Sequence, residues 1–288
     1  MEVIFGGVRG SQPVCAPGYA IYGGDTTSVL VSGRDGERIV IDAGTGVANL
    51  EPGLRDVREV MILFSHYHLD HLSGLPCFLP LYDKTRIVTM IGPAAGGGVE
   101  NAVRGLLGPP YWPVPMDQMG AELRFVDFTG GDLCGEESHV DKPYVHGGLE
   151  LRALAVHHPG GCLAWRVDEP ATDRAVVFAT DVEWRLMPSP RQNAFRTFCR
   201  EPRAVDLLIM DGHYAADEYR HHAGWGHSSL DDVRDLGHEV GAGRVLVTHH
   251  APENDDDELA RRDAALADDE RLGLARQGQV VALPEDPA

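Results

Sequence analysis

Three histidines and one aspartate crowd into six residues, His-Tyr-His-Leu-Asp-His, which begin at His66. The segment follows the apolar run Val60–Phe64, which is typical of a buried strand. Imidazole and carboxylate are costly to bury unless they are hydrogen-bonded or bind a metal, and together they suit zinc, manganese or iron. Because the residues alternate along a turn, His66 and His68 can converge on one ion while Asp70 and His71 face a second. A loop of merely solvated histidines is the alternative, and the density of ligands argues against it.

Further candidate ligands stand at the ends of other apolar runs. Each run is four to eight residues long, and a polar residue begins where the run stops, as expected for buried strands that end at an open edge. The candidates are His157 and His158 after Leu149–Val156, Asp181 after Ala175–Thr180, Asp211 and His213 after Leu207–Met210, and His249 and His250 after Val245–Thr248. Because the ends of several strands can meet at one rim, the sequence predicts a single site assembled from the whole chain.

An ordered series of motifs resembles the metallo-β-lactamase-fold hydrolases. The series comprises Phe5–Pro13, Tyr22–Ser28, Ile41–Gly46, His66–His71, His158–Gly161, Ala179–Asp181, Gly224–Ser228 and Thr248–Pro252. The HxHxDH motif alone indicates the superfamily, whereas the ordered set is similar to its phosphodiesterase and ribonuclease Z-like branch. The resemblance runs from about residue 1 to about residue 283. It implies an α/β protein with a four-layer αββα sandwich, in which helices flank two mixed β-sheets.

The resemblance also implies two divalent metal ions per chain, with zinc expected first and manganese or iron as alternatives. The implied ligands are His66, His68 and His158 for the first ion, Asp70, His71 and His249 for the second, and Asp181 as a bridge. In such a site a hydroxide between the ions forms near neutral pH, because coordination lowers the pKa of water. Asp42 resembles an aspartate that orients ligands without binding metal.

Two ligand positions require a choice between neighbouring histidines. The His-Pro-Gly-Gly and Thr-His registers of the family select His158 and His249. We therefore expect His157 and His250 to support the site or to lie at the surface. The other histidines stand in polar or glycine-containing stretches, and we expect them to be solvated: His139, His146, His221, His222 and His238.

His227 stands immediately before an expected helix. Ser228 with Asp231, or Ser229 with Asp232, fits the pattern of a capping hydroxyl followed three residues later by an acid, so a helix is expected from Leu230 to about Val240. A helix N-terminus favours anions, which places His227 to meet a phosphate. The alternative is a histidine that only packs on Trp225.

The resemblance implies that His227 handles the phosphate and the leaving group, with Asp211 supporting it. Together with Asp70, these are the expected catalytic residues. Two departures from ribonuclease Z argue against tRNA processing: Asp211–Tyr214 replaces a glutamate-led motif, and Ser229 replaces a threonine.

The expected function is metal-dependent hydrolysis of a small phosphodiester such as a cyclic nucleotide, with the bridging hydroxide as nucleophile. Hydrolysis of a lactone or thioester on the same two-ion site is the nearest alternative. It needs the same hydroxide but has less use for His227. An iron-dependent oxidoreductase or oxygenase is an alternative of another class, because the ligand set suits iron equally well. The chain has 25 basic and 44 acidic residues and a net charge of −19, which disfavours capture of a large nucleic acid.

Length and composition predict one domain over residues 1–288, and a homodimer remains open. The five cysteines include no CxxC pair, the first residues read as a strand, and no apolar run reaches membrane-spanning length. We therefore expect a cytoplasmic protein with a small-molecule substrate and no membrane partner.

Thr129–Gly148 is expected to be a surface excursion or a lid. The aromatic segment Tyr111–Pro115 either packs in the core or lines a pocket.

Overall fold

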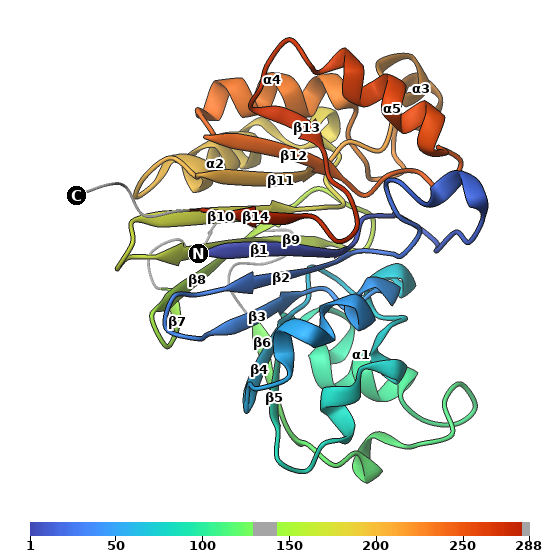
Figure 1. The fold of residues 1–288 in the computed structure, drawn as a ribbon. Helices are drawn as coiled ribbons and strands as arrows, with labels where there is room; N and C mark the ends of the chain where they lie inside the picture. The colour runs from blue at the N-terminus through green and yellow to red at the C-terminus, as the bar shows by residue number, and fades with distance from the viewer. Residues whose placement is uncertain (129–142, 284–288) are drawn as a thin grey trace.

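The computed structural model describes residues 1–128 and 143–283. These residues form two seven-stranded β-sheets that pack face to face, with helices on both outer faces (Figure 1). The expected four-layer αββα sandwich is therefore confirmed.

The first sheet has the strand order β14-β1-β2-β3-β4-β5-β6. Its strands are β1 (Glu2–Gly7), β2 (Ser28–Ser32), β3 (Arg38–Ile41), β4 (Glu59–Leu63), β5 (Ile87–Pro93), β6 (Glu122–Phe128) and β14 (Val280–Ala282). Strands β14 to β3 pair antiparallel, and β3 to β6 pair parallel. The sheet is therefore mixed.

The second sheet has the order β13-β12-β11-β10-β9-β8-β7. Its strands are β7 (Tyr144–His146), β8 (Leu149–Val156), β9 (Cys162–Glu169), β10 (Arg174–Ala179), β11 (Leu207–Asp211), β12 (Arg244–Thr248) and β13 (Leu272–Leu274). Strands β10 to β13 run parallel, and β7 to β10 pair antiparallel. Because β9 runs against both of its neighbours, β8, β10, β11 and β12 share one direction, and their carboxyl ends lie at one edge.

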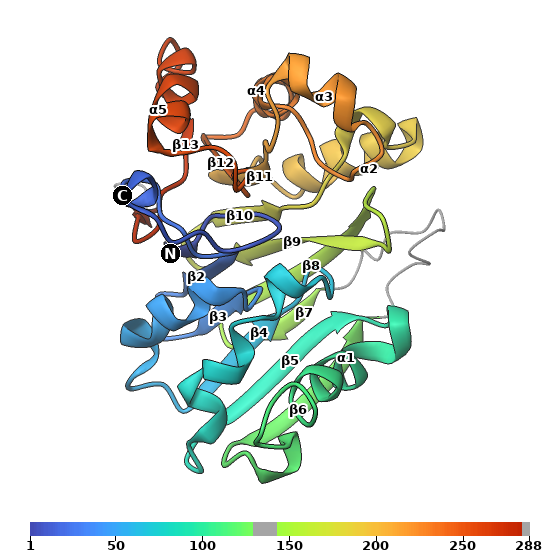
Figure 2. The ribbon, with the colours of Figure 1, turned by 90° about the vertical axis from the view of Figure 1, so that its right-hand side faces the viewer.

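Helices cover the outer face of each sheet, as the two perpendicular views show (Figures 1 and 2). The second sheet carries α2 (Ser189–Arg200), α3 (Ala216–His222), α4 (Leu230–Val240) and α5 (Asp256–Ala265), while α1 (Gly98–Leu106) covers the first. Short 3₁₀ helices occupy Pro17–Tyr19, Thr45–Leu54, Leu69–His71, Leu75–Cys77, Leu79–Tyr82, Ala95–Gly97, Met116–Gln118 and Trp184–Leu186. The helix predicted from Leu230 to about Val240 is confirmed, and Ser229 is its N-cap.

Three layers of apolar side chains hold the sandwich together. The layer between the sheets includes Phe5, Trp165 and Phe178, and the other two lie between each sheet and its helices. The central strands are therefore buried on both faces, and every residue of β2, β9, β10 and β11 is buried. This packing fixes the strand ends, and polar side chains beyond them can be held in defined positions.

Several expectations about surface segments can now be compared with the structure. Tyr111 is exposed, whereas Trp112 is half-buried and donates its Nε1–H to the Tyr82 hydroxyl at 3.0 Å. Most of the expected excursion Thr129–Gly148 lies outside the described residues, and its end forms β7 and the following turn. None of the helices in the described part of the chain has the length and apolar character needed to span a bilayer.

Candidate metal centre

The structure brings the seven expected ligands together from four loops. Each loop follows a strand: β4 precedes the His66–His71 segment, β8 precedes His158, β10 precedes Asp181 and β12 precedes His249. The side chains form two groups in which the ligand atoms lie within 4.8 Å of one another: His66, His68, His158 and Asp181 in one, and Asp70, His71 and His249 in the other. His249 also belongs to a third group of this kind, with His213 and His227.

The first group is built from three imidazole rings around one carboxylate. The ring centroids of His66 and His68 lie 4.4 Å apart, and that of His158 lies 4.9 Å from His66 and 5.0 Å from His68. Asp181 Oδ1 lies 3.5 Å from His158 Nε2 and 3.9 Å from His66 Nε2. All are buried except His68, which is exposed and forms the open side of the group.

The second group is buried throughout. His71 Nε2 lies 3.3 Å from Asp70 Oδ2, and His249 Nε2 lies 3.8 Å from the same oxygen. The backbone N–H of Ser11 donates to Asp70 Oδ2 at 2.8 Å, so the first loop of the chain helps to fix this ligand.

Asp181 connects the two groups. Its Oδ2 lies 3.1 Å from His71 Nε2, and its Oδ1 lies 3.4 Å from His249 Nε2, in addition to its approach to the first group. A carboxylate that faces both sets of nitrogens has the geometry of a bridging ligand.

Buried ligand atoms without hydrogen bonds show that these residues fit divalent ions. Among the described residues, His66 Nε2, His71 Nε2, His249 Nε2 and Asp181 Oδ2 are buried and have no hydrogen-bond partner. Leaving such atoms unpaired costs about 1–3 kcal/mol each. Imidazole nitrogens and carboxylate oxygens at this spacing are the ligands that zinc and related cations use, and a bound cation would satisfy them.

A buried network holds His66 and His71 in place. Asp42 Oδ2 accepts hydrogen bonds from the Ser65 hydroxyl at 2.7 Å and from His71 Nδ1 at 2.8 Å, and its Oδ1 accepts from Ser65 N–H at 2.7 Å. The Ser65 hydroxyl in turn lies 3.0 Å from His66 Nδ1. Asp42 therefore orients ligands from behind, as the resemblance implied.

Two of the remaining three histidine ligands, His158 and His249, also have partners on Nδ1. His158 Nδ1 donates to the Gly226 carbonyl at 2.9 Å, and His249 Nδ1 lies 3.0 Å from the Thr27 hydroxyl. With Nδ1 engaged in this way, His249 Nε2 is left without a hydrogen-bond partner and is available to a metal, whereas His158 Nε2 lies 3.1 Å from His68 Nδ1.

Burial and neighbouring charges shift the pKa values of the site residues in opposite directions. Burial, with the nearby imidazoles of His71 and His158, lowers the pKa of His66 well below its usual value. Burial alone would raise the pKa of the Asp181 carboxyl, but the imidazoles of His249, His71 and His66 outweigh it and lower that pKa well below normal. A neutral imidazole and an ionised carboxylate are the forms that bind metal.

His227 and Asp211 form a hydrogen-bonded pair beside the metal ligands. His227 Nδ1 lies 2.7 Å from Asp211 Oδ2 and 3.9 Å from Asp181 Oδ1. Asp211 is the last residue of β11, and His227 lies in the loop that leads into α4. Burial would lower the pKa of His227, but the charge and hydrogen bond of Asp211 prevail and raise it to about 9. Asp211 therefore favours the charged form of the imidazole next to the site.

His213 is a strand-end candidate from the sequence that was not among the seven implied ligands or the expected catalytic residues. Its Nδ1 donates to the His249 carbonyl at 2.8 Å, and its ring stacks on His227 with centroids 4.5 Å apart. Burial lowers the pKa of His213 to about 3, so the ring is neutral. Its position after β11 was the only signal of its place in the site.

The unselected histidines lie outside the two ligand groups. His250 is buried and its Nε2 donates to the Ala275 carbonyl at 2.9 Å, while His157 is half-buried. His221 and His238 are exposed as expected, whereas His146 is half-buried. The expectation for His222 was wrong, because its ring is half-buried and stacks on Tyr214 with centroids 4.6 Å apart. His139 lies outside the described residues.

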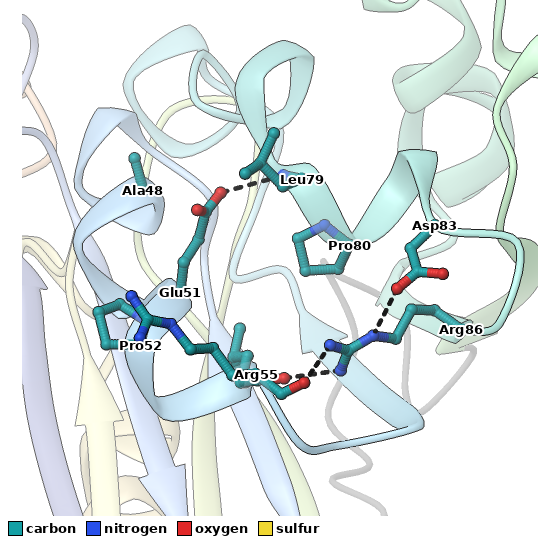
Figure 3. Close-up of a pocket in the computed structure, with 9 residues that line it drawn as sticks. Ala48, Glu51, Pro52, Arg55, Leu79, Pro80, Asp83 and Arg86 are labelled. Atoms are coloured by element: carbon teal, nitrogen blue, oxygen red, sulfur yellow. Dashed lines mark hydrogen bonds and ion pairs between the residues drawn. The ribbon is translucent and has the colours of Figure 1, made fainter.

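A separate pocket of about 440 Å³ shares no lining residue with the metal centre. It lies between the Thr45–Leu54 helix and the segment around Leu79 (Figure 3). One of the two arginines that line it, Arg86, donates hydrogen bonds to Asp83 and to the carbonyls of Leu54 and Arg55.

Two packed mixed sheets, with histidines and aspartates gathered beyond their strand ends, define a metal-dependent hydrolase of the metallo-β-lactamase fold. The chain belongs to the beta-lactamase superfamily domain family, whose model matches residues 37–250.

Similarity to individual proteins places the chain in the ribonuclease Z-like branch of these hydrolases. It is 25% identical to the ribonuclease Z of Lachnoclostridium phytofermentans, over 78% of this chain and 82% of that protein. It is 23% identical to the ribonuclease Z of Haloarcula marismortui, over 99% of this chain and 95% of that protein.

Solved structures show the same fold. The metallo-β-lactamase fold protein YhfI from Bacillus subtilis superposes with a TM-score of 0.68 at 19% identity, over 98% of this chain and 99% of that one. A diphosphatase from the PhnP family superposes with a TM-score of 0.69 at 16% identity, over 99% of this chain and 98% of that one.

Proposed function

We propose that the chain is a phosphodiesterase with two metal ions that hydrolyses a small phosphodiester, a cyclic nucleotide being the first class to test. The observation that carries this proposal is the His227–Asp211 pair, 2.7 Å apart and beside the bridging position of Asp181. A charged imidazole next to the metal ligands suits a phosphate, because it binds an anion and can donate a proton.

Each residue of the pair has a separate task in this proposal. Asp211 accepts the Nδ1–H of His227, keeps the imidazole protonated and fixes its orientation. The proton on His227 Nε2 then passes to the oxygen of the leaving group as its bond to phosphorus breaks. Two divalent ions, when bound to the seven ligands, supply an activated water and neutralise charge on the phosphate oxygens.

Two alternatives use the same ligands and make different demands on His227. Hydrolysis of a lactone or thioester has less use for a charged imidazole that meets a phosphate. An iron-dependent oxidoreductase or oxygenase would need redox-active iron, and the ligand set also suits that metal. Metal analysis of protein purified without added metal, followed by an ester panel, separates these alternatives. Zinc with phosphodiester turnover supports the proposal, and iron without ester turnover contradicts it.

Ribonuclease Z relatives make a nuclease activity the most specific competitor. The net charge of −19 argues against capture of a long polyanion, whereas the charge of a small diester can be met by metals and by His227. Precursor tRNA and a cyclic nucleotide should be assayed side by side at several salt concentrations. Efficient cleavage of precursor tRNA with a steep loss at high salt would favour the nuclease over the small-diester enzyme.

The test of the proposal is His227→Ala assayed with leaving groups of graded pKa. Turnover of bis(p-nitrophenyl) phosphate should fall roughly a hundredfold or more, the scale for loss of a positioned proton donor. The loss should grow as the leaving group becomes poorer, because a poorer leaving group needs more protonation. Asp211→Asn should show a weaker form of the same trend, because Asp211 acts through the imidazole. Metal content should remain near that of the parent protein.

Two outcomes would contradict the phosphate-handling role of His227. One is loss of a metal ion in His227→Ala, which would make the residue a ligand. The other is parental turnover of every substrate in the variant, which would favour the lactone or thioester alternative.

A further inference from the structure

The loop between α3 and α4 (orange in Figure 2) carries His227 and is tied down by a buried carboxylate from another part of the chain. Glu183, which follows β10, is fully buried. Its Oε1 accepts the Gly224 N–H at 2.6 Å and the Tyr219 hydroxyl at 2.9 Å, and its Oε2 accepts the Gly226 N–H at 2.9 Å. Charge-assisted hydrogen bonds of this kind are about twice as strong as neutral ones. The backbone on both sides of Trp225 is therefore fixed.

The same loop is also pressed against a metal ligand. The Gly226 carbonyl accepts the hydrogen bond from His158 Nδ1, and Gly226 has a φ of +95°. A Cβ at this position would lie 2.3 Å from His158 Nδ1, so only glycine allows the approach. Glu183 on one side and His158 on the other thus hold the residues that flank Trp225.

Trp225 is the exposed side chain of this fixed loop. Its side chain is 64% exposed, and its ring stands edge-on to His222 with centroids 4.9 Å apart. His222 stacks in turn on Tyr214, so the indole is supported at one side and open at the other. Single exposed apolar residues are common, but a tryptophan whose backbone is fixed two residues before His227 is a preorganised contact surface.

A second exposed apolar residue, Leu69, directly follows a metal ligand in the chain. Leu69 is 66% exposed and follows His68, whose ring lies 5.0 Å from that of His158. Trp225 and Leu69 therefore each adjoin, in the chain, a residue that contacts His158: Gly226 accepts its hydrogen bond, and the ring of His68 lies against its ring. This arrangement suits a substrate that carries both a phosphate and a flat apolar group.

We propose that Trp225 is a binding residue that stacks on an aromatic ring of the substrate, while Glu183 holds the loop so that Trp225 and His227 act together. The proposal rests on the phosphodiesterase function proposed above and narrows its substrates to diesters that bear a nucleobase or an aryl group. Aromatic stacking tolerates different rings, because every ring offers a flat π-face.

Matched ligand pairs test this proposal by calorimetry on zinc-loaded protein. Adenosine 5′-monophosphate is compared with ribose 5-phosphate, which lacks the base, and phenyl phosphate is compared with methyl phosphate. The parent should bind the aromatic member of at least one pair about tenfold more tightly, and the responding pair identifies the ring as nucleobase or aryl. Trp225→Ala should remove that preference, and Trp225→Phe should retain most of it.

Tyr111→Ala is the control, because Tyr111 is exposed and aromatic but makes none of these contacts. Glu183→Gln should weaken the same preference and reduce turnover of bis(p-nitrophenyl) phosphate while metal content is retained. Equal binding of both members of each pair by the parent, with diester turnover intact, overturns the role of Trp225 and leaves the phosphodiesterase standing. Loss of the preference in Tyr111→Ala, and not in Trp225→Ala, overturns that role as well. If the parent hydrolyses no phosphodiester, both proposals fall.

Discussion

At the scale of single residues, Asp181 is the side chain that faces both groups of expected metal ligands. Its two oxygens face imidazole nitrogens of both ligand groups at 3.1 to 3.9 Å, and Oδ2 has no hydrogen bond among the described residues. A carboxylate in this place can contact two cations at once, because each of its oxygens can bind one. The arrangement of both groups therefore depends on it.

Asp181→Ala should lower bound metal from about two ions per chain and abolish hydrolysis, because both ions lose a shared ligand. Metal content by elemental analysis is the measurement. Asp211→Asn is the matched control, since Asp211 is equally buried but contacts His227 and not the ligands, and it should keep its metal. Two retained ions with full activity in Asp181→Ala would remove Asp181 from the site.

The adjacent residues His249 and His250 give the second prediction at this scale. His249 directs Nε2 to the ligand group, whereas His250 directs Nε2 to the Ala275 carbonyl in the core. His249→Ala should lose metal and activity. His250→Ala should keep its metal but lose roughly 1–3 kcal/mol of unfolding free energy, because a buried carbonyl is left unpaired.

Elemental analysis and denaturant unfolding of both variants separate metal binding from stability. The reverse order, with metal lost only in His250→Ala, would shift the assignment of the last ligand by one residue.

At the scale of elements, the strand ends explain why so much of the site could be predicted. Apolar runs reveal strands, and polar residues directly after them must lie at a sheet edge, which places the ligand loops without any tertiary information.

Backbone geometry adds a shared feature that the sequence does not reveal. Asp42, Asp181 and His249 all have positive φ values, of 58°, 57° and 59°. Non-glycine residues in this conformation are strained and concentrate at functional sites.

Contacts between loops could not be predicted from the sequence. Glu183 bonds to Gly224 and Gly226 some forty residues away, and His213 reaches the His249 carbonyl across two strands. Neither contact follows a helical or strand period, and no metal motif contains these residues. The sequence pattern also could not decide which residue caps α4, because Ser228 with Asp231 and Ser229 with Asp232 fit the capping spacing equally well. The structure assigns the cap to Ser229, because the Ser228 hydroxyl is engaged with the Val182 carbonyl and the Trp184 N–H.

The cap of α4 can be tested by substitution. The Ser229 hydroxyl accepts the Asp232 N–H at 3.4 Å and donates to the Asp232 carboxylate at 2.7 Å. Ser229→Ala should cost about 1 kcal/mol of stability and lower the melting temperature by about 2–4 °C. Asp231→Ala is the control from the other capping pair, and it should shift the temperature less, because the Asp231–Arg234 pair is exposed. An equal shift in the two variants would contradict the assigned cap.

At the scale of the whole molecule, the metal centre joins the two sheets. The His66–His71 loop belongs to the first sheet, whereas His158, Asp181 and His249 follow strands of the second. Bound ions would therefore tie together layers that are otherwise held by the apolar interior. We propose that residues 1–288 form one domain for this reason, since neither sheet contains a complete set of ligands.

Metal removal provides the test at this scale. Chelation should lower the melting temperature of the protein, because the buried atoms His66 Nε2, His71 Nε2, His249 Nε2 and Asp181 Oδ2 lose their partners. A ligand at about a thousand times its Kd stabilises the native state by ~4 kcal/mol, so zinc should restore the lost stability in a concentration-dependent way. Scanning calorimetry of loaded and chelated protein should show one transition that moves as a unit. Asp181→Ala should respond less to the chelator than the parent does, since it binds less metal. Two separate transitions, of which only one responds to zinc, would contradict both the single domain and the joining of the two sheets by metal.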